Sequence, residues 1–145
     1  MADMPFEGPL LKTELVRTIG IPEQGFFLEY DDSDYAQRIL QHSKIVYVTN
    51  AILHRQLAKK NPGNTKSSHA PYTWRMYYTL RNNIIFDRRY GKNWAVRHVS
   101  PRLLLLQTLL IAVRDRHVKQ NVPLILKAYR DGIHERMGKR VEPNY

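Results

Sequence analysis

Residues 25–53 read GFFLEYDDSDYAQRILQHSKIVYVTNAIL, and this stretch decides the fold that the sequence predicts. Its first six residues are aromatic and apolar, which is typical of a short β-strand. Ser33 is a favoured N-cap residue, so a helix is expected to follow it and to end near Ser43. Residues 44–53 are β-branched and apolar, which predicts a second strand. The order strand, helix, strand indicates an α/β sheet.

The sequence on either side of this stretch extends the prediction. Residues 9–19 place an apolar side chain at every fourth position, which is typical of a short amphipathic helix. Residues 55–71 are polar and basic, and loops longer than about 12–15 residues are usually functional or disordered. Beyond this linker, three helices are expected over residues 72–90, from Ser100 to Lys119 and from Pro123 to Met137. The predicted organisation is thus 1–54, a linker at 55–71, and a basic helical part at 72–145.

The amino-acid composition narrows the classes of protein to which this chain could belong. The chain has 145 residues, 43% of them apolar, so it can form one folded domain. It has no cysteine, which excludes disulfide scaffolds, Cys-ligated zinc and thiol nucleophiles. The net charge of +10 invites an anionic partner, but it is divided unevenly. Residues 1–50 hold 4 basic and 8 acidic residues, whereas residues 51–145 hold 19 and 5.

No targeting segment is visible in the sequence. The opening MADMPFEGP has neither a basic region nor an apolar core of signal-peptide type. The longest apolar stretch, residues 103–113, would span about 16 Å as a helix, roughly half of a bilayer's hydrocarbon core. These features favour the cytoplasm.

The sharpest cluster of chemistry-bearing residues is Tyr30-Asp31-Asp32-Ser33-Asp34, at the predicted junction of strand and helix. Ligand sites in open α/β sheets lie beyond the carboxyl ends of strands. Adjacent carboxylates there can bind a hard cation, or one of them can act as a general base. The alternative is structural, because Asp and Ser at a helix start cap its free amides and favour its dipole.

The segment FFLEYDDSDYAQRI followed by KIVYVTNAILH resembles the second half of the catalytic domain of family-2 glycosyltransferases. The rhamnosyl- and galactofuranosyltransferase-like branch is the most similar. The matching positions are Gly8, Phe26, Phe27, Asp31, Asp32, Arg38 and His54. Residues 5–23, 77–91 and 128–141 also resemble, in order, the acceptor-side segment, the Tyr-Arg-Asn helix and the ending of that branch.

This resemblance implies an α/β fold, the C-terminal part of a GT-A (nucleotide-diphospho-sugar transferase) domain followed by a helical extension. Asp32 would be the general base of an inverting transfer, and Asp31 would shape the field around it. His54 would complete a site for Mg²⁺ or Mn²⁺, although a lone histidine after a strand is also commonly a surface or core residue. Gly8, Phe27 and Arg38 would contact substrate, with a structural ion pair as the alternative for Arg38.

The resemblance also implies partners: a nucleotide-sugar donor and a glycan or lipid-linked acceptor used in cell-surface polysaccharide synthesis. Two departures matter. The family has a glycine after the Arg-bearing helix, where this chain has His42-Ser43. The family's nucleotide half, with its Asp-x-Asp metal motif, precedes the matched part and is not in this sequence. We therefore expect a partial enzyme that transfers poorly alone, with unpaired strand edges that favour homo-oligomers.

The basic half allows a second interpretation of the chain, as a non-enzymatic helical module. Its net charge of +14 suits nucleic acid, yet no nucleic-acid-binding motif is recognisable, so nucleic acid is not favoured. The apolar run at 103–113, flanked by Arg102 and Arg114, suits an anionic membrane surface such as the inner face of the plasma membrane. Packing of this run on the catalytic part or on another subunit remains open as the alternative.

Overall fold

The computed structural model describes residues 4–54 and 73–142. Within these ranges the protein is helical and no β-strand is present. Its elements are α1 (Thr13–Ile19), the 3-10 turn η1 (Gln24–Phe26), α2 (Asp31–Leu40), α3 (Trp74–Tyr90), α4 (Trp94–His98), α5 (Ser100–Arg114) and α6 (Val118–Ile133). The predicted α/β fold, with part of a GT-A domain, is therefore wrong for the described residues.

The first predicted strand, residues 25–30, is instead a tight turn and a loop that leads into α2. Phe27, Glu29 and Tyr30 have φ of 65°, 61° and 69°, which lie in the left-handed region that no strand occupies. The backbone carbonyls of this loop accept hydrogen bonds from side chains of α3 rather than from a neighbouring strand. Because buried carbonyls need a donor of some kind, these side chains replace the ladder that the sequence pattern predicted.

The second predicted strand, residues 44–53, lies without a partner strand. Val46, Tyr47 and Val48 are 76%, 75% and 68% exposed, so the alternating side chains have no sheet face to cover. A β-strand requires a second chain segment to accept and donate its backbone hydrogen bonds, and no described segment supplies one. The residues of this stretch therefore have high β propensity, but they form no strand in the described protein.

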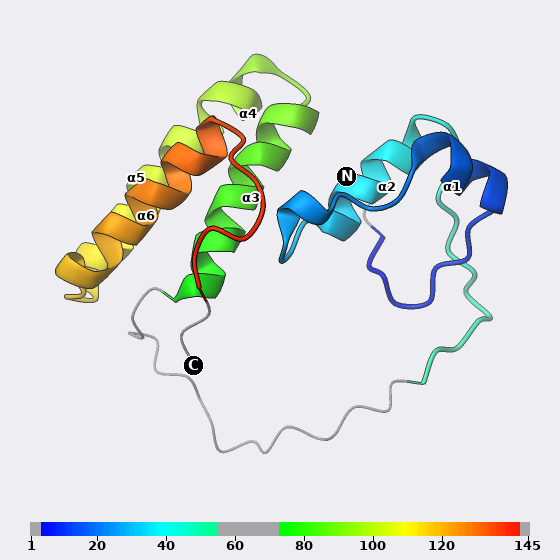
Figure 1. Cartoon of the computed structure of the whole chain (residues 1–145), viewed down its shortest axis with the longest axis horizontal. Coiled ribbons are helices and arrows are strands. Elements are labelled where there is room, and N and C mark those ends of the chain that lie inside the picture. The colour runs from blue at the N-terminus through cyan, green and yellow to red at the C-terminus, as the bar shows by residue number, and fades with distance from the viewer. Residues whose placement is uncertain (1–3, 55–72, 143–145) are drawn as a thin grey trace.

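The α3 helix is the centre of the molecule, and two parts of the chain pack on it. The α5 and α6 helices pack on one side. The loop at residues 25–30 packs on the other side, where α2 follows it and α1 lies farther from α3 (Figure 1). Tyr77, Leu80 and Ile84 of α3 are buried against α5 and α6. Phe86 contacts Tyr30, whose ring centroid lies 5.5 Å away, on the side of the N-terminal half. A helix covered from two sides needs apolar residues around most of its circumference, which explains the sequence of α3.

The helical boundaries follow local signals. The helix predicted over 72–90 coincides with α3, and Pro101 stands in the first turn of α5, where its missing N–H is not needed. The short α4 was not predicted; its N-cap Asn93 accepts a hydrogen bond from the Val96 N–H at 2.9 Å. The α6 helix begins at Val118, five residues before the predicted Pro123, which lies inside it. The predicted linker at 55–71 lies outside the described residues.

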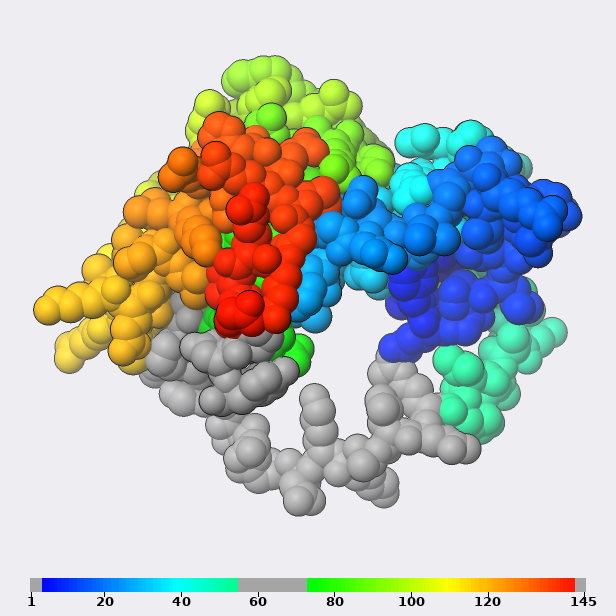
Figure 2. Space-filling view, viewed as in Figure 1, coloured from blue at the N-terminus to red at the C-terminus, as the bar shows by residue number. Residues whose placement is uncertain are grey.

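The C-terminal segment after α6 runs back along α3 as an extended strap. The Tyr78 hydroxyl donates to the Val141 carbonyl at 2.9 Å and accepts from the Arg140 and Val141 N–H groups. Closer to α6, the Gly138 N–H donates to the Gly25 carbonyl at 2.6 Å. The strap thus joins both halves of the molecule, and Figure 2 shows it against residues of the N-terminal turn. Among the described residues, no helix combines the length and apolarity needed to cross a bilayer.

Candidate functional site

The acidic cluster forms the start of α2. The helix begins at Asp31, earlier than predicted, so Ser33 lies inside the first turn and is not the N-cap. Oδ1 of Asp32 accepts a hydrogen bond from the Ser33 N–H at 2.8 Å. Asp31 and Asp32 are both half-buried, and neither carboxylate forms an ion pair with another described residue. Their negative charge stands at the positive end of the helix dipole, which favours it.

Asp34, in contrast, forms a hydrogen bond and ion pairs with other residues of the fold. It is buried, and its Oδ1 accepts a hydrogen bond from the Tyr90 hydroxyl at 2.8 Å. Arg89 and Arg38 lie 3.5 Å and 3.8 Å from its carboxylate oxygens. Burial, and then the bond to Asp34, raise the pKa of the Tyr90 hydroxyl far above its usual value. The acidic cluster therefore divides into one structural carboxylate and two carboxylates that remain available for chemistry.

The loop that precedes Asp31 and Asp32 is held in a strained backbone conformation by side chains of α3. Three of its four residues from Phe27 to Tyr30 are non-glycine residues with positive φ, a conformation that costs of order 1 kcal/mol or more each. Nδ2 of Asn82 donates to the carbonyls of Phe26 and Glu29 at 3.1 Å and 2.9 Å, and to that of Leu28 between them. We call Arg81 and Asn82, with the loop carbonyls they bind, the α3 clamp.

Arg81 completes the clamp from the preceding position. Its guanidinium donates to the carbonyls of Phe26 at 2.7 Å and Gly138 at 2.6 Å, and its Nε donates to Asn82 Oδ1. Burial lowers the pKa of Arg81, and the nearby Tyr77 and Asp131 oppose this shift. Sequence reasoning did not single out these two residues as functional. A charged and an amide side chain inside the apolar run YYTLRNNIIF was the signal that could have revealed them.

The predicted substrate residues do not come together in one place. Phe27 is 43% exposed, and its ring packs on Tyr78 with centroids 4.8 Å apart. Arg38 donates to the carbonyls of Ile21, at 3.0 Å, and Ile19, and it contacts the carboxylate of Asp34. These contacts match the structural alternative for Arg38. Gly8 lies apart from both, with φ of 76° and its α-carbon facing the methyl groups of Leu53.

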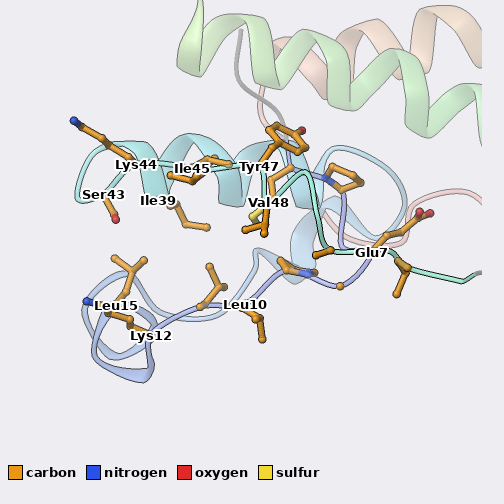
Figure 3. A pocket seen from close by; sticks show the side chains of 18 of the residues that line it. Glu7, Leu10, Lys12, Leu15, Ile39, Ser43, Lys44, Ile45, Tyr47 and Val48 are labelled. Carbon is orange, nitrogen blue, oxygen red and sulfur yellow. The ribbon is translucent and has the colours of Figure 1, made fainter.

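Gly8 lines a cavity of about 740 Å³ between the N-terminal segment and residues 43–53. Figure 3 shows Leu15 and Ile39 pointing toward each other across it from different segments. Its lining is mostly apolar, with polar side chains from Glu7, Lys12 and Lys44 at the margins. Asp31 and Asp32 do not line it, so this cavity and the acidic pair are separate features.

His54 is exposed at the end of the described N-terminal half. The described residues contain no group of three or more His, Asp or Glu side chains placed to hold a metal ion. A divalent cation needs several ligands, and His54 supplies one imidazole. The described residues alone therefore do not fit the Mg²⁺ or Mn²⁺ site that the resemblance implies, and His54 stays a predicted ligand.

Comparison with known proteins adds no further constraint. No protein-family model, curated protein or solved structure was found to match this chain. The candidate site is thus defined by its own geometry: two available carboxylates at a helix start, next to a strained loop and a buried clamp.

Proposed function

We propose that this chain supplies the catalytic base and the acceptor side of an inverting glycosyltransferase that uses a nucleotide-sugar donor. Asp32 is the base and Asp31 its electrostatic partner. The observation that carries the proposal is the division of the acidic cluster, in which Asp34 is buried in a network with Tyr90 and Arg89 whereas Asp31 and Asp32 form no ion pair with a described residue. The resemblance of residues 26–39 to family-2 glycosyltransferases supports the same assignment.

The main group that this chain must supply for an inverting sugar transfer is a positioned carboxylate. The acceptor hydroxyl gives its proton to Asp32 as its oxygen attacks the anomeric carbon of the donor sugar. The new carbon–oxygen bond forms on the face opposite the departing nucleoside diphosphate, which leaves with the electron pair of the old bond. Attack from the opposite face inverts the configuration of the sugar.

The α3 clamp supports this role because a base must be held in place before the substrate arrives. Fixing a reacting group in productive geometry can lower a barrier by several kcal/mol, whereas a mobile carboxylate loses much of that benefit. The strained loop at 27–30 leads directly into Asp31, so the clamp sets the direction from which α2 begins. Strain of this kind is commonly found at functional sites.

Donor binding is assigned to no described residue. In the family that the chain resembles, a separate α/β half binds the nucleotide, and we propose the same division of labour here. The donor is a nucleotide-linked sugar, and the acceptor is a glycan or is lipid-linked. We place the reaction on the cytoplasmic side, where nucleotide sugars are made.

The test is the Asp32→Asn variant of this protein. We expect sugar transfer, measured with dTDP-rhamnose and UDP-galactofuranose as donors, to fall by about 10²–10⁴-fold because the proton acceptor is lost. Donor binding, measured by calorimetry, should stay unchanged because the proposed base acts on the acceptor hydroxyl.

The control is Glu14→Gln, which removes a carboxylate from the first turn of α1 at an exposed position. It should leave transfer within about twofold of the parent protein, because surface changes away from a site have small effects. Full transfer by the Asp32→Asn protein would refute the assignment of the base.

A further inference from the structure

The α5 helix carries an exposed apolar ridge that the other described residues do not cover. Its members are Leu103, Leu106, Leu110 and Val113, which are 60%, 54%, 60% and 59% exposed. Spacings of three, four and three residues place them on one face of the helix. We call this set the α5 ridge.

The opposite face of α5 already serves the core. Pro101 and Ala112 are buried, and Leu104, Leu105 and Leu109 pack against the main hydrophobic cluster. The helix is therefore apolar on both faces, although only one face is needed for folding. Contiguous exposed apolar surface of this kind marks an interaction site more often than chance.

The charges around the ridge identify the kind of partner. From Trp94 to Arg130 the sequence has seven Lys and Arg residues and one acidic residue, Asp115. Arg102 and Arg114 stand at the two ends of the ridge, and both are exposed. Asp115 is paired with Arg114 Nε at 2.8 Å, and its own side chain is only 6% exposed. The ridge is thus flanked at both ends by exposed arginines, in a part of the chain with an excess of basic residues.

We propose that the α5 ridge is the face by which this protein lies on an anionic lipid surface. The helix lies parallel to the membrane plane, with its four apolar side chains among the upper acyl chains and the arginines at the phosphate level. Fifteen residues span about 22 Å, which suits a helix lying on the surface. Apolar burial supplies part of the attraction, and each nearby Lys or Arg adds attraction to acidic headgroups.

This proposal stands on the exposure and charge of α5 and does not depend on the assignment of Asp32. It agrees with a lipid-linked acceptor, because a protein bound to the membrane surface and an acceptor anchored in that membrane would lie on the same surface. A second copy of this chain is the alternative occupant of the ridge, and it gives a distinct result in the following experiment.

The experiment measures co-sedimentation with vesicles of phosphatidylcholine mixed with equal parts of phosphatidylglycerol, and with vesicles of phosphatidylcholine alone. We expect binding to the anionic vesicles, weakened by added salt, and little binding to the neutral ones. The double variant Leu106→Gln, Leu110→Gln should bind anionic vesicles about tenfold or more weakly, because less apolar surface enters the lipid.

The control is the pair Leu10→Gln, Leu126→Gln, two exposed leucines outside the ridge. This pair should bind as the parent protein does. Because all four positions are exposed, circular dichroism should show folded protein in every case. Negligible binding of the parent to both vesicles overturns the proposal. So does a concentration-dependent dimer that the ridge variant abolishes while vesicle binding is unchanged.

Discussion

At the scale of single residues, two buried tyrosine–carboxylate pairs anchor α3 to its neighbours. The Tyr77 hydroxyl donates to Asp131 Oδ2 at 2.6 Å, and the Tyr90 hydroxyl donates to Asp34 Oδ1 at 2.8 Å. Burial first, and then these bonds, raise the pKa of both hydroxyls far above the usual value. Hydrogen bonds to a charged acceptor are stronger than neutral ones, so each pair contributes more than an ordinary tyrosine contact.

These shifts predict a loss of stability at alkaline pH. In the unfolded chain a tyrosine ionises near pH 10, whereas the folded phenols keep their protons to higher pH. The stabilisation is therefore complete below about pH 10 and declines as the pH rises through and beyond that value. Tyr90→Phe should cost about 1–3 kcal/mol at pH 8, and that difference should shrink above pH 10. Urea unfolding followed by tryptophan fluorescence measures both.

The control for this prediction is Tyr47→Phe, at a position that is 75% exposed. Its effect on the free energy of unfolding should be small at every pH. A Tyr90→Phe difference that stays constant from pH 8 to pH 11 would show that the hydroxyl does not titrate differently in the folded and unfolded states.

At the scale of elements, the contact between α3 and α6 depends on a glycine. Gly132 lies in the last turn of α6, and a β-carbon there would stand 2.9 Å from Ile84 Cβ and 3.0 Å from the Arg81 carbonyl oxygen. Both distances are shorter than van der Waals contact, and one of them involves backbone. The absence of a side chain thus allows the two helices to approach closely beside the α3 clamp.

We therefore expect Gly132→Ala to lower the free energy of unfolding by about 1–3 kcal/mol, as overpacked positions do. Replacing glycine by alanine inside an unobstructed helix has the opposite sign, with a gain of roughly 0.5–1 kcal/mol. Thermal unfolding followed by circular dichroism distinguishes the two outcomes. In the Ile84→Ala background the same change should cost somewhat less, because Ile84 Cγ2, which would also stand 3.0 Å from the new β-carbon, is removed while Cβ remains. A stabilised Gly132→Ala protein would contradict the close approach.

The elements also show where sequence patterns are informative. The periodic apolar residues of α3 predicted that helix, and Pro101 predicted where α5 begins, because helical signals lie within the segment itself. The predicted end of α5 at Lys119 was wrong, since the helix ends at Arg114. Residues 25–30 and 44–53 were predicted as strands and are not. A strand depends on a distant partner, and the pattern of one segment does not reveal whether that partner is present.

At the scale of the whole molecule, the α3 clamp joins the N-terminal half to the helical bundle. The clamp, the Asp34 pair with Tyr90 and the burial of Phe26 tie residues 25–34 to α3. The acidic pair at Asp31 and Asp32 is thus held by the bundle, although the two parts lie far apart in the sequence. The bundle therefore supports the candidate site from one side while its α5 ridge faces away.

Asn82→Ala tests this connection. It leaves the buried carbonyls of Phe26, Leu28 and Glu29 without their amide donor, so we expect a loss of at least about 2 kcal/mol of stability. Hydrogen exchange should accelerate over residues 24–40 and stay slow over residues 104–112 in α5. The acceleration should be local because the contacts of α5 with α6 do not involve Asn82.

The matched control is Asn83→Ala, the same substitution one position along α3. Asn83 Nδ2 donates to the Tyr30 hydroxyl, which is a side chain rather than loop backbone. The exchange rates over residues 24–40 should change less in this variant. Equal effects of the two substitutions would show that the loop does not depend on the clamp.

The sequence by itself determined the main helices, the uneven division of charge, and the position of the acidic cluster at the start of a helix. These properties depend on local periodicity and on composition. The tertiary structure decided which carboxylates remain available, because Asp34 is distinguished from Asp31 and Asp32 only by the distant partners Tyr90 and Arg89. It also decided the fate of the predicted strands. In residues 25–30 the backbone carbonyls accept hydrogen bonds from side chains of α3. Residues 44–53 pair with no described segment, so they form no strand.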